Sequence, residues 1–174
     1  VELPLLVIGL SRRVVTVVVV LQVYLEDVVL AGIGIDPEIE VLIWSDMLDP
    51  AHNAHDNYYD VVGDFTGSWK FVPKDLLIMC WNHGIRNESL EFFSSQDFRT
   101  FGAAYYDTDD LTNSREWLNS LKNIPNAQGI MYTSWMKKYE LLADFGDLVS
   151  GKINYDRIFQ IIKKMSGLIR NQMN

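Results

Sequence analysis

The stretch Leu76-Leu-Ile-Met-Cys-Trp-Asn82 decides the fold, because an unbroken apolar run ends there in a tryptophan followed by an amide. Three other segments have the same form, with an aromatic residue and polar groups at or just beyond the run: residues 41–46, 101–107 and 129–135. The four recur roughly every 25 to 37 residues with helix-like sequence between most of them, which is typical of consecutive βα units. In a parallel sheet such runs are buried strands whose carboxyl ends open where ligands bind. The sequence therefore predicts an α/β fold whose strand ends line one binding edge.

The length of the chain limits how many such units it can hold. Its 174 residues suffice for a domain with a core but fall short of the roughly 250 typical of a complete eight-unit barrel. We predict parallel (β/α) units in a partial, TIM-barrel-like array, about half to five-eighths of a barrel. Residues 1–40 form a valine-rich segment, and residues 41–174 form a C-terminal (β/α) half-barrel that ends in a helix over 154–170. An open half-barrel leaves strand edges unpaired, so we expect a partner half-barrel, self-association or closure by the valine-rich strands.

Shorter elements follow from local patterns. Residues 5–9 and 14–24 are rich in β-branched or aliphatic residues and favour strands, although a buried helix over the second remains an alternative. Helices are expected over 88–95, 114–122 and 136–149.

Composition excludes several classes of function. A net charge of −8 argues against nucleic acid as the main partner, because phosphate binding requires clustered lysine and arginine. No apolar run reaches the roughly 18 to 20 residues of a membrane span, so no membrane partner is expected. The single cysteine, Cys80, lies inside a strand-like run and is interpreted as a buried thiol. No glycine-rich phosphate loop occurs, and we expect no cofactor.

A histidine pair invites a metal interpretation. His52 and His55, followed by Asp56, have a spacing that zinc sites use, but they lie among proline, asparagine and aspartate residues. We interpret this run as a solvated loop and predict no metal site.

The strand ends carry the candidate site. Trp44, Trp81 and Trp135 present indole faces, which suit the C–H faces of a sugar ring, and Asp46 and Asp107 supply acceptors for its hydroxyls. The alternative is that the tryptophans are core residues and the aspartates cap helices, as in an α/β interaction domain. Complete enclosure of all three indoles by protein would exclude the sugar pocket.

These residues, taken in order, resemble a known family. Trp44, Trp81, the Tyr105-x-Asp107 element and Trp135 resemble the second half of the (β/α)8 barrel of family 20 glycoside hydrolases, the β-N-acetylhexosaminidases. The resemblance covers roughly residues 41–145. It implies that the tryptophans wall a pocket around the N-acetyl group, that Tyr105 hydrogen-bonds the acetamide, and that Asp107 contacts sugar hydroxyls.

The sequence departs from this family where catalysis occurs. The family uses substrate-assisted catalysis with an Asp-Glu pair that follows a glycine at the end of the fourth strand. The segment in that place, residues 5–9, is followed by Leu-Ser-Arg-Arg, and the family's glutamate after the last tryptophan is Lys137 here. We therefore expect recognition of an N-acetylhexosamine-type glycan without the catalytic pair. If the chain is active alone, Asp46 and Asp107 are its acid/base candidates, and a catalytic acid there requires a raised pKa and a separation of about 5 to 9.5 Å.

Three explanations of the missing pair stay open. The chain is a C-terminal piece of a barrel whose catalytic half is another segment or was lost, or it is a divergent, non-catalytic carbohydrate-binding domain. In the third explanation, residues 1–40 are not the natural sequence.

Overall fold

The computed structural model describes residues 5–6, 14–16, 40–56 and 64–151. The chain divides into two compact units, Val1–Lys138 and Tyr139–Asn174. The described part of the second unit contains one helix, α4 (Leu142–Ser150). Most of the valine-rich segment and the helix expected over 154–170 lie outside the described residues.

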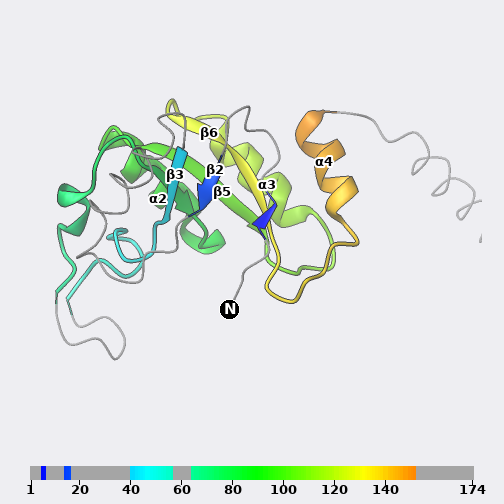
Figure 1. Ribbon diagram of the computed structural model, residues 1–174, viewed down its shortest axis with the longest axis horizontal. Coiled ribbons are helices and arrows are strands. Elements are labelled where there is room, and N and C mark those ends of the chain that lie inside the picture. Colours follow the sequence, from blue (N-terminus) through cyan, green and yellow to red (C-terminus); the bar gives the residue numbers. More distant parts are fainter. Residues whose placement is uncertain (1–4, 7–13, 17–39, 57–63, 152–174) are drawn as a thin grey trace, which may run out of the picture. The chain divides into compact units, whose positions relative to one another are not determined.

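A parallel sheet forms the centre of the first unit (Figure 1). Its four central strands are β3 (Glu40–Trp44), β4 (Leu77–Cys80), β5 (Arg99–Tyr105) and β6 (Ala127–Thr133). They are parallel, and each pairs with the next along the chain. The four apolar runs are therefore strands, as predicted, and the α/β class with parallel βα units is confirmed.

Two short strands complete the edges of the sheet. β2 (Val14–Thr16) runs parallel to β3, and β1 (Leu5–Leu6) runs antiparallel to β6 at the opposite edge. Residues 5–9 stood in the place of the family's fourth strand, but Leu5–Leu6 is antiparallel and pairs with β6, whereas β2 is the strand beside β3. The residues that directly follow β2 in the sequence are the four valines 17–20, so this strand is not directly followed by a carboxylate either.

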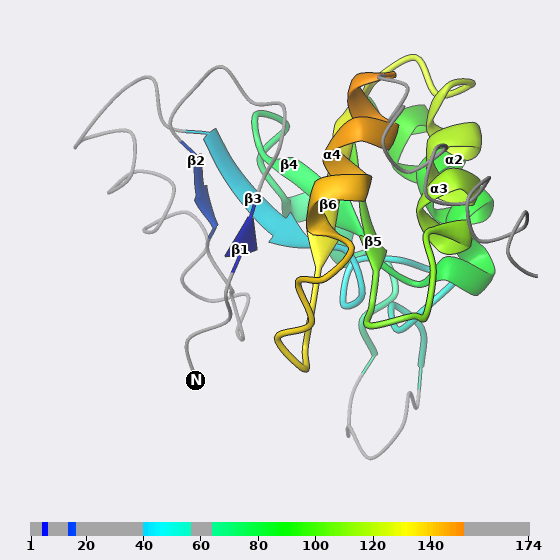
Figure 2. The same ribbon diagram turned by 90° about the vertical axis from the view of Figure 1, so that its right-hand side faces the viewer.

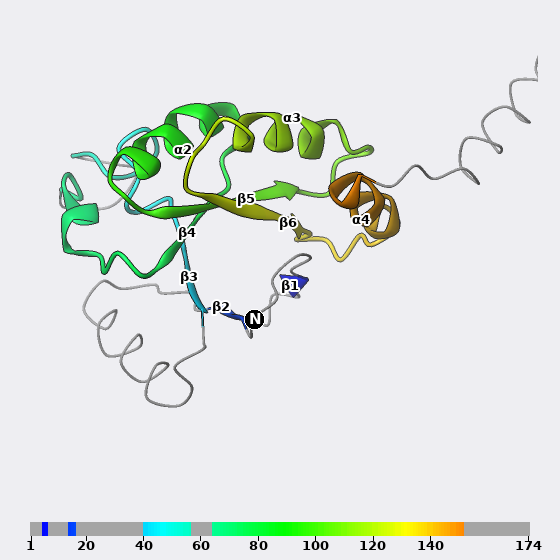
Figure 3. The same cartoon turned by 90° about the horizontal axis from the view of Figure 1, so that it is seen from above.

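Helices cover one face of this sheet. α2 (Arg86–Ser95) and α3 (Thr112–Leu121) lie side by side on the same face (Figures 2 and 3). Both were predicted, and each begins two residues earlier than expected. Short 3-10 helices, η2 (Ser68–Phe71) and η3 (His83–Ile85), occupy the connections before and after β4.

The helix expected over 136–149 begins only at Leu142. The residues before it make a tight turn instead, in which Lys137 has a left-handed φ of 59°. The Met136 N–H donates to Asp107, which lies at the end of β5. A left-handed residue interrupts a right-handed helix, so the local pattern was overridden by a contact with another strand.

Gly102 of β5 allows α3 to approach the sheet closely. A Cβ atom at this position would lie 2.9 Å from Cε3 of Trp117 and 3.0 Å from Cδ1 of Leu121. Trp117 is completely buried, so its ring has little room to move.

We expect the substitution Gly102→Ala to lower the free energy of unfolding by about 1–3 kcal/mol, the usual effect of overpacking a core. Urea unfolding measures this as a lower midpoint with an unchanged m-value. Gly84→Ala is the matched control, because a Cβ atom there meets only Asn82 Oδ1 at an ordinary 3.5 Å. Equal midpoints for the two variants would contradict the close approach of α3.

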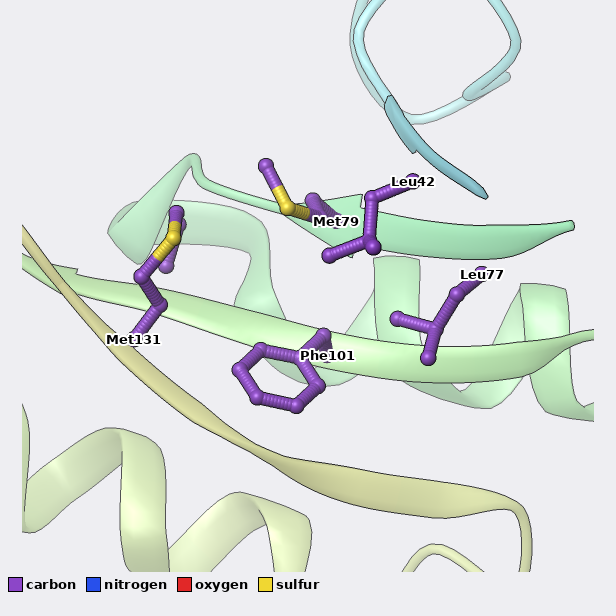
Figure 4. Packing of buried hydrophobic residues seen from close by; sticks show 6 residues of the cluster. Leu42, Leu77, Met79, Phe101 and Met131 are labelled. Atoms are coloured by element: carbon purple, nitrogen blue, oxygen red, sulfur yellow. The ribbon is translucent and has the colours of Figure 1, made fainter. Parts of the chain in front are cut away.

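The opposite face of the sheet carries an apolar layer, which we call the inner layer. Successive strand residues point to opposite faces, and Gly102 faces α3, so Phe101 and Ala103 face away from the helices. They join side chains from the other three central strands (Figure 4), and the inner layer comprises Leu42, Leu77, Met79, Phe101, Ala103 and Met131. The strands turn progressively from β6 to β3, so that the sheet curves around this layer (Figure 3).

The amino end of the inner face is closed by an ion pair. Arg99 Nη1 donates to both carboxylate oxygens of Glu40, at 3.0 and 2.7 Å, across the intervening strand β4. Its Nη2 donates to the backbone carbonyl of Asp75. The charged groups at this end are thus engaged with one another, whereas the carboxyl end of the same face is aromatic.

Candidate functional site

A row of aromatic side chains lies at the carboxyl ends of the central strands. Trp44, Trp81 and Tyr106 are half-buried and pack against the inner layer. Tyr106 lies 6.0 Å from Trp81 between ring centroids, and 6.5 Å from Trp135 with ring planes only 24° apart. We call these four residues the aromatic row. Trp135 is 55% exposed, so none of the three tryptophans is enclosed and the condition that excludes a sugar pocket is not met.

Tyr106, and not the predicted Tyr105, lies in the aromatic row. The Tyr105 side chain is 1% exposed and stacks on Tyr132 with ring centroids 4.1 Å apart. The cause lies in the backbone, because Tyr105, Tyr106 and Asp107 have consecutive left-handed φ values of 84°, 51° and 60°. This turn breaks the strand alternation, which would otherwise have put Tyr105 on the same face as Ala103. Such conformations are uncommon for bulky residues, and they concentrate at functional sites.

Asp107 is engaged by its own chain. The Ser134 hydroxyl donates to Oδ1 at 2.5 Å, and the backbone N–H groups of Trp135 and Met136 donate to Oδ2 at 2.7 and 2.9 Å. Burial raises the pKa of this carboxyl, but these hydrogen bonds outweigh it and hold the pKa below the ordinary value. This direction is opposite to the one that a general acid requires.

Asp46 is the carboxylate beside the aromatic row. It lies half-buried just beyond β3, and its backbone carbonyl accepts the N–H of Asn53 at 3.1 Å. Among the described residues its carboxylate makes no hydrogen bond or ion pair. Burial first, and then the charge of Asp46, raise the pKa of Tyr106. The phenol therefore stays protonated, and its hydroxyl oxygen is buried.

His52 lies in the site rather than in a solvated loop. Its ring meets the edge of Trp81 at a centroid distance of 4.9 Å, whereas His55 is exposed as expected. The chain turns back at this point, with the His52 N–H donating to the carbonyl of Asp49 at 3.0 Å. This long-range contact has no signature in the sequence. The predicted solvated loop is thus wrong for His52.

His83, another histidine at a strand end, lies outside the row. Its Nε2 is 2.6 Å from Glu116 of α3, which Arg86 also approaches, at 3.8 Å. Asp110, in the same acidic loop as Asp107, accepts at 2.8 Å the N–H of Thr112, the first residue of α3.

Asp49 is a completely buried acid just beyond β3. Its Oδ1 accepts the N–H of Ala51 at 2.9 Å, whereas Oδ2 has no hydrogen-bond partner among the described residues. Burial raises the pKa of this carboxyl, against the opposing effects of Ser89, the Ala51 N–H and His52. The folded protein therefore holds Asp49 protonated more readily than the unfolded chain does.

This shift predicts a pH dependence of stability. The contribution of Asp49 is fully present below its unfolded pKa, near 3.8, and is lost as the pH rises through the higher folded value. We expect Asp49→Asn to gain stability relative to the wild type between about pH 3 and about pH 7. Urea midpoints of both proteins across this range measure the difference. A difference that does not change with pH would contradict the shift.

The described residues hold no group of three or more histidine, cysteine, aspartate or glutamate side chains that could hold a metal ion. Among them there is also no helix of the length and apolarity that crossing a membrane requires. No protein-family model, no curated protein and no solved structure matches this chain.

Proposed function

We propose that the chain is a carbohydrate-binding domain of the family 20 hexosaminidase type, built as a partial TIM-like barrel, which recognises an N-acetylhexosamine-type glycan. Three features of the sheet support the barrel. The central strands follow one another in sequence order, without the reversal of a doubly wound sheet. α2 and α3 cover one face, and the inner layer fills the other, as in (β/α) barrels.

The observation that carries the proposal is the aromatic row. Three of its four rings rest on the inner layer, at the strand ends where barrels bind their ligands, and all four residues keep part of their surface exposed. Half-exposed indoles over a packed layer offer a large, rigid apolar face at little cost in conformational entropy. The C–H face of a pyranose matches such a surface.

The groups around the row suit the rest of such a sugar. Tyr106 adds its ring to the apolar surface and not a hydroxyl, because its hydroxyl oxygen is buried. Asp46 supplies a carboxylate for a ring hydroxyl. Both groups lie at the strand ends where Trp44 and Trp81 meet the inner layer.

Hydrolysis by this chain alone is not part of the proposal. Residues 17–20, directly after β2, and residues 10–13 contain no carboxylate, and Lys137 replaces the later glutamate of the family. The low pKa of Asp107 is unsuited to protonating a leaving group. We therefore expect binding without turnover.

Calorimetric titration with N-acetylglucosamine, alongside an assay with an aryl N-acetylglucosaminide, tests this function. The expected result is saturable binding, weaker binding of glucose, which lacks the acetamide, and no hydrolysis. Turnover would restore the hydrolase. Absence of both binding and turnover would overturn the proposal.

A second candidate, a protein-interaction domain, is favoured by one observation. Trp135 is 55% exposed and its neighbour Met136 is 70% exposed, so two large apolar side chains project from one turn. Single exposed apolar residues are ordinary, but adjacent ones also occur at interfaces. Sedimentation equilibrium separates the candidates: a concentration-dependent dimer that Met136→Ser abolishes, with no sugar binding, would select the interaction domain.

A further inference from the structure

We propose that Asp107 is a positioning residue, which holds the turn over residues 134–136 so that Trp135 stays in the aromatic row, and that it does not itself contact the glycan. This inference rests on the proposed function and assigns Asp107 a part other than the hydroxyl contact that the family resemblance implies.

The hydrogen bonds of the carboxylate support the first half of the inference. An ionised carboxylate offers about four acceptor sites, and three are occupied here, by the Ser134 hydroxyl and by the N–H groups of Trp135 and Met136. Hydrogen bonds to a charged acceptor are about twice as strong as neutral ones. Little capacity is left for a sugar hydroxyl.

A second set of hydrogen bonds closes the turn. The Lys138 N–H donates to the Ser134 Oγ at 2.7 Å, and the Lys138 carbonyl accepts the hydroxyl of Tyr132 at 2.8 Å. Lys138 Nζ also reaches the carbonyl of Asp107 at 3.4 Å. The turn is thereby tied back to β6 on one side and to the end of β5 on the other.

Trp135 depends on these bonds because little packing holds it. Its side chain is 55% exposed and its ring lies beside that of Tyr106. Tyr106 is itself fixed, since its N–H donates to the carbonyl of Thr133 at 2.9 Å. The next residue, Asp107, adds a second link between the two chain segments, because its carboxylate accepts the N–H of Trp135. Exposed segments with few apolar contacts open easily unless hydrogen bonds hold them.

The choice of substitution follows from the backbone. Asp107 has a φ of 60°, which alanine adopts only with strain, so Asp107→Gly removes the carboxylate without adding that strain. Asp107→Asn keeps an acceptor oxygen and also tolerates this φ, so it should rescue in part. Asp110→Gly is the matched control, because Asp110 accepts the Thr112 N–H and not an amide of the 134–136 turn.

The test combines amide hydrogen exchange with calorimetry on the full chain. In Asp107→Gly we expect exchange at the amides of Trp135 and Met136 to rise about tenfold or more, the effect of losing one charge-assisted hydrogen bond. The amide of Ala103 in β5 serves as an internal reference for folding. The dissociation constant for N-acetylglucosamine should rise by about the same factor. Asp110→Gly should change neither quantity at the turn.

Two outcomes would overturn the inference. Weaker binding with both amides still protected would mean that Asp107 contacts the sugar directly. Loss of protection with unchanged affinity would mean that the position of Trp135 does not matter to binding. If the wild-type chain binds no N-acetylglucosamine, the proposed function fails instead, and the exchange rates alone decide whether Asp107 holds the turn.

Discussion

Replacing Trp81 by alanine is expected to weaken binding of N-acetylglucosamine by roughly 30-fold or more, the equivalent of ~2 kcal/mol for an aromatic residue at the centre of a binding surface. Trp81 contacts His52 on one side and Tyr106 on the other, and it also rests on the inner layer. Its removal therefore takes away the stacking surface and loosens both neighbours. Calorimetric titration measures the loss, and Trp81→Phe, which keeps an aromatic face, should retain part of the affinity.

Trp69→Ala is the matched control for this substitution. Trp69 is also a half-buried tryptophan, but it lies in η2 and packs edge-on against Phe92 of α2 at 5.0 Å. It belongs to the helix-covered side and should leave the affinity unchanged. Equal losses of affinity in the two variants would show that the aromatic row is not the binding surface.

Phe101→Ala is expected to lower the free energy of unfolding by about 3–5 kcal/mol, the usual range for a buried phenylalanine. Phe101 is 1% exposed and belongs to the inner layer. Its ring also covers Gly129, where a Cβ atom would lie 2.9 Å from Cε2 of Phe101. A cavity at this point would remove packing from both β5 and β6. Urea unfolding should show a lower midpoint. Because the free energy of unfolding of such proteins is typically about 5–15 kcal/mol, this loss is a large fraction of the total.

Phe71→Ala tests whether this loss comes from burial. Phe71 is 78% exposed in η2, so the same change of side chain removes almost no packing. We expect its midpoint to stay within about 0.5 kcal/mol of the wild type. A large loss in Phe71→Ala, or a small one in Phe101→Ala, would contradict the assignment of the inner layer as core.

The strands could be predicted from sequence because they are buried on both faces. In β4 all four residues are buried, so the run from Leu77 to Cys80 is apolar throughout and no alternation conceals it. α2 and α3 were predicted for a related reason, since each follows such a run at the spacing of a βα unit. The course of Leu5–Leu6 was not predictable, because a short aliphatic run does not encode whether it pairs parallel or antiparallel.

The site was predicted less completely because its arrangement depends on long-range contacts. Trp44, Trp81 and Trp135 lie at or just beyond strand ends, as the pattern indicated. Because Tyr105, Tyr106 and Asp107 have left-handed φ values, Tyr106 and not Tyr105 lies in the aromatic row. A tyrosine in the sequence does not predict such a backbone conformation.

The hydrogen bonds and the pKa of Asp107 also depend on long-range contacts that the sequence does not show. Its partners are 27 to 29 residues away along the chain, so local sequence suggested only a cap or a sugar contact. In the structure, Asp107, just beyond β5, accepts hydrogen bonds from residues just beyond the adjacent strand β6, and these bonds lower its pKa.

The central claim is that N-acetylglucosamine binds on the aromatic row, and the indole N–H resonances of the five tryptophans test it directly. In a titration followed by nuclear magnetic resonance, the signals of Trp44, Trp81 and Trp135 should shift in a saturable manner. The signals of Trp117, a completely buried residue of α3 that packs against Gly102 of the sheet, and of Trp69 should stay unchanged and act as internal references. Absence of any shift, or shifts confined to Trp69 and Trp117, would contradict a sugar site at these strand ends.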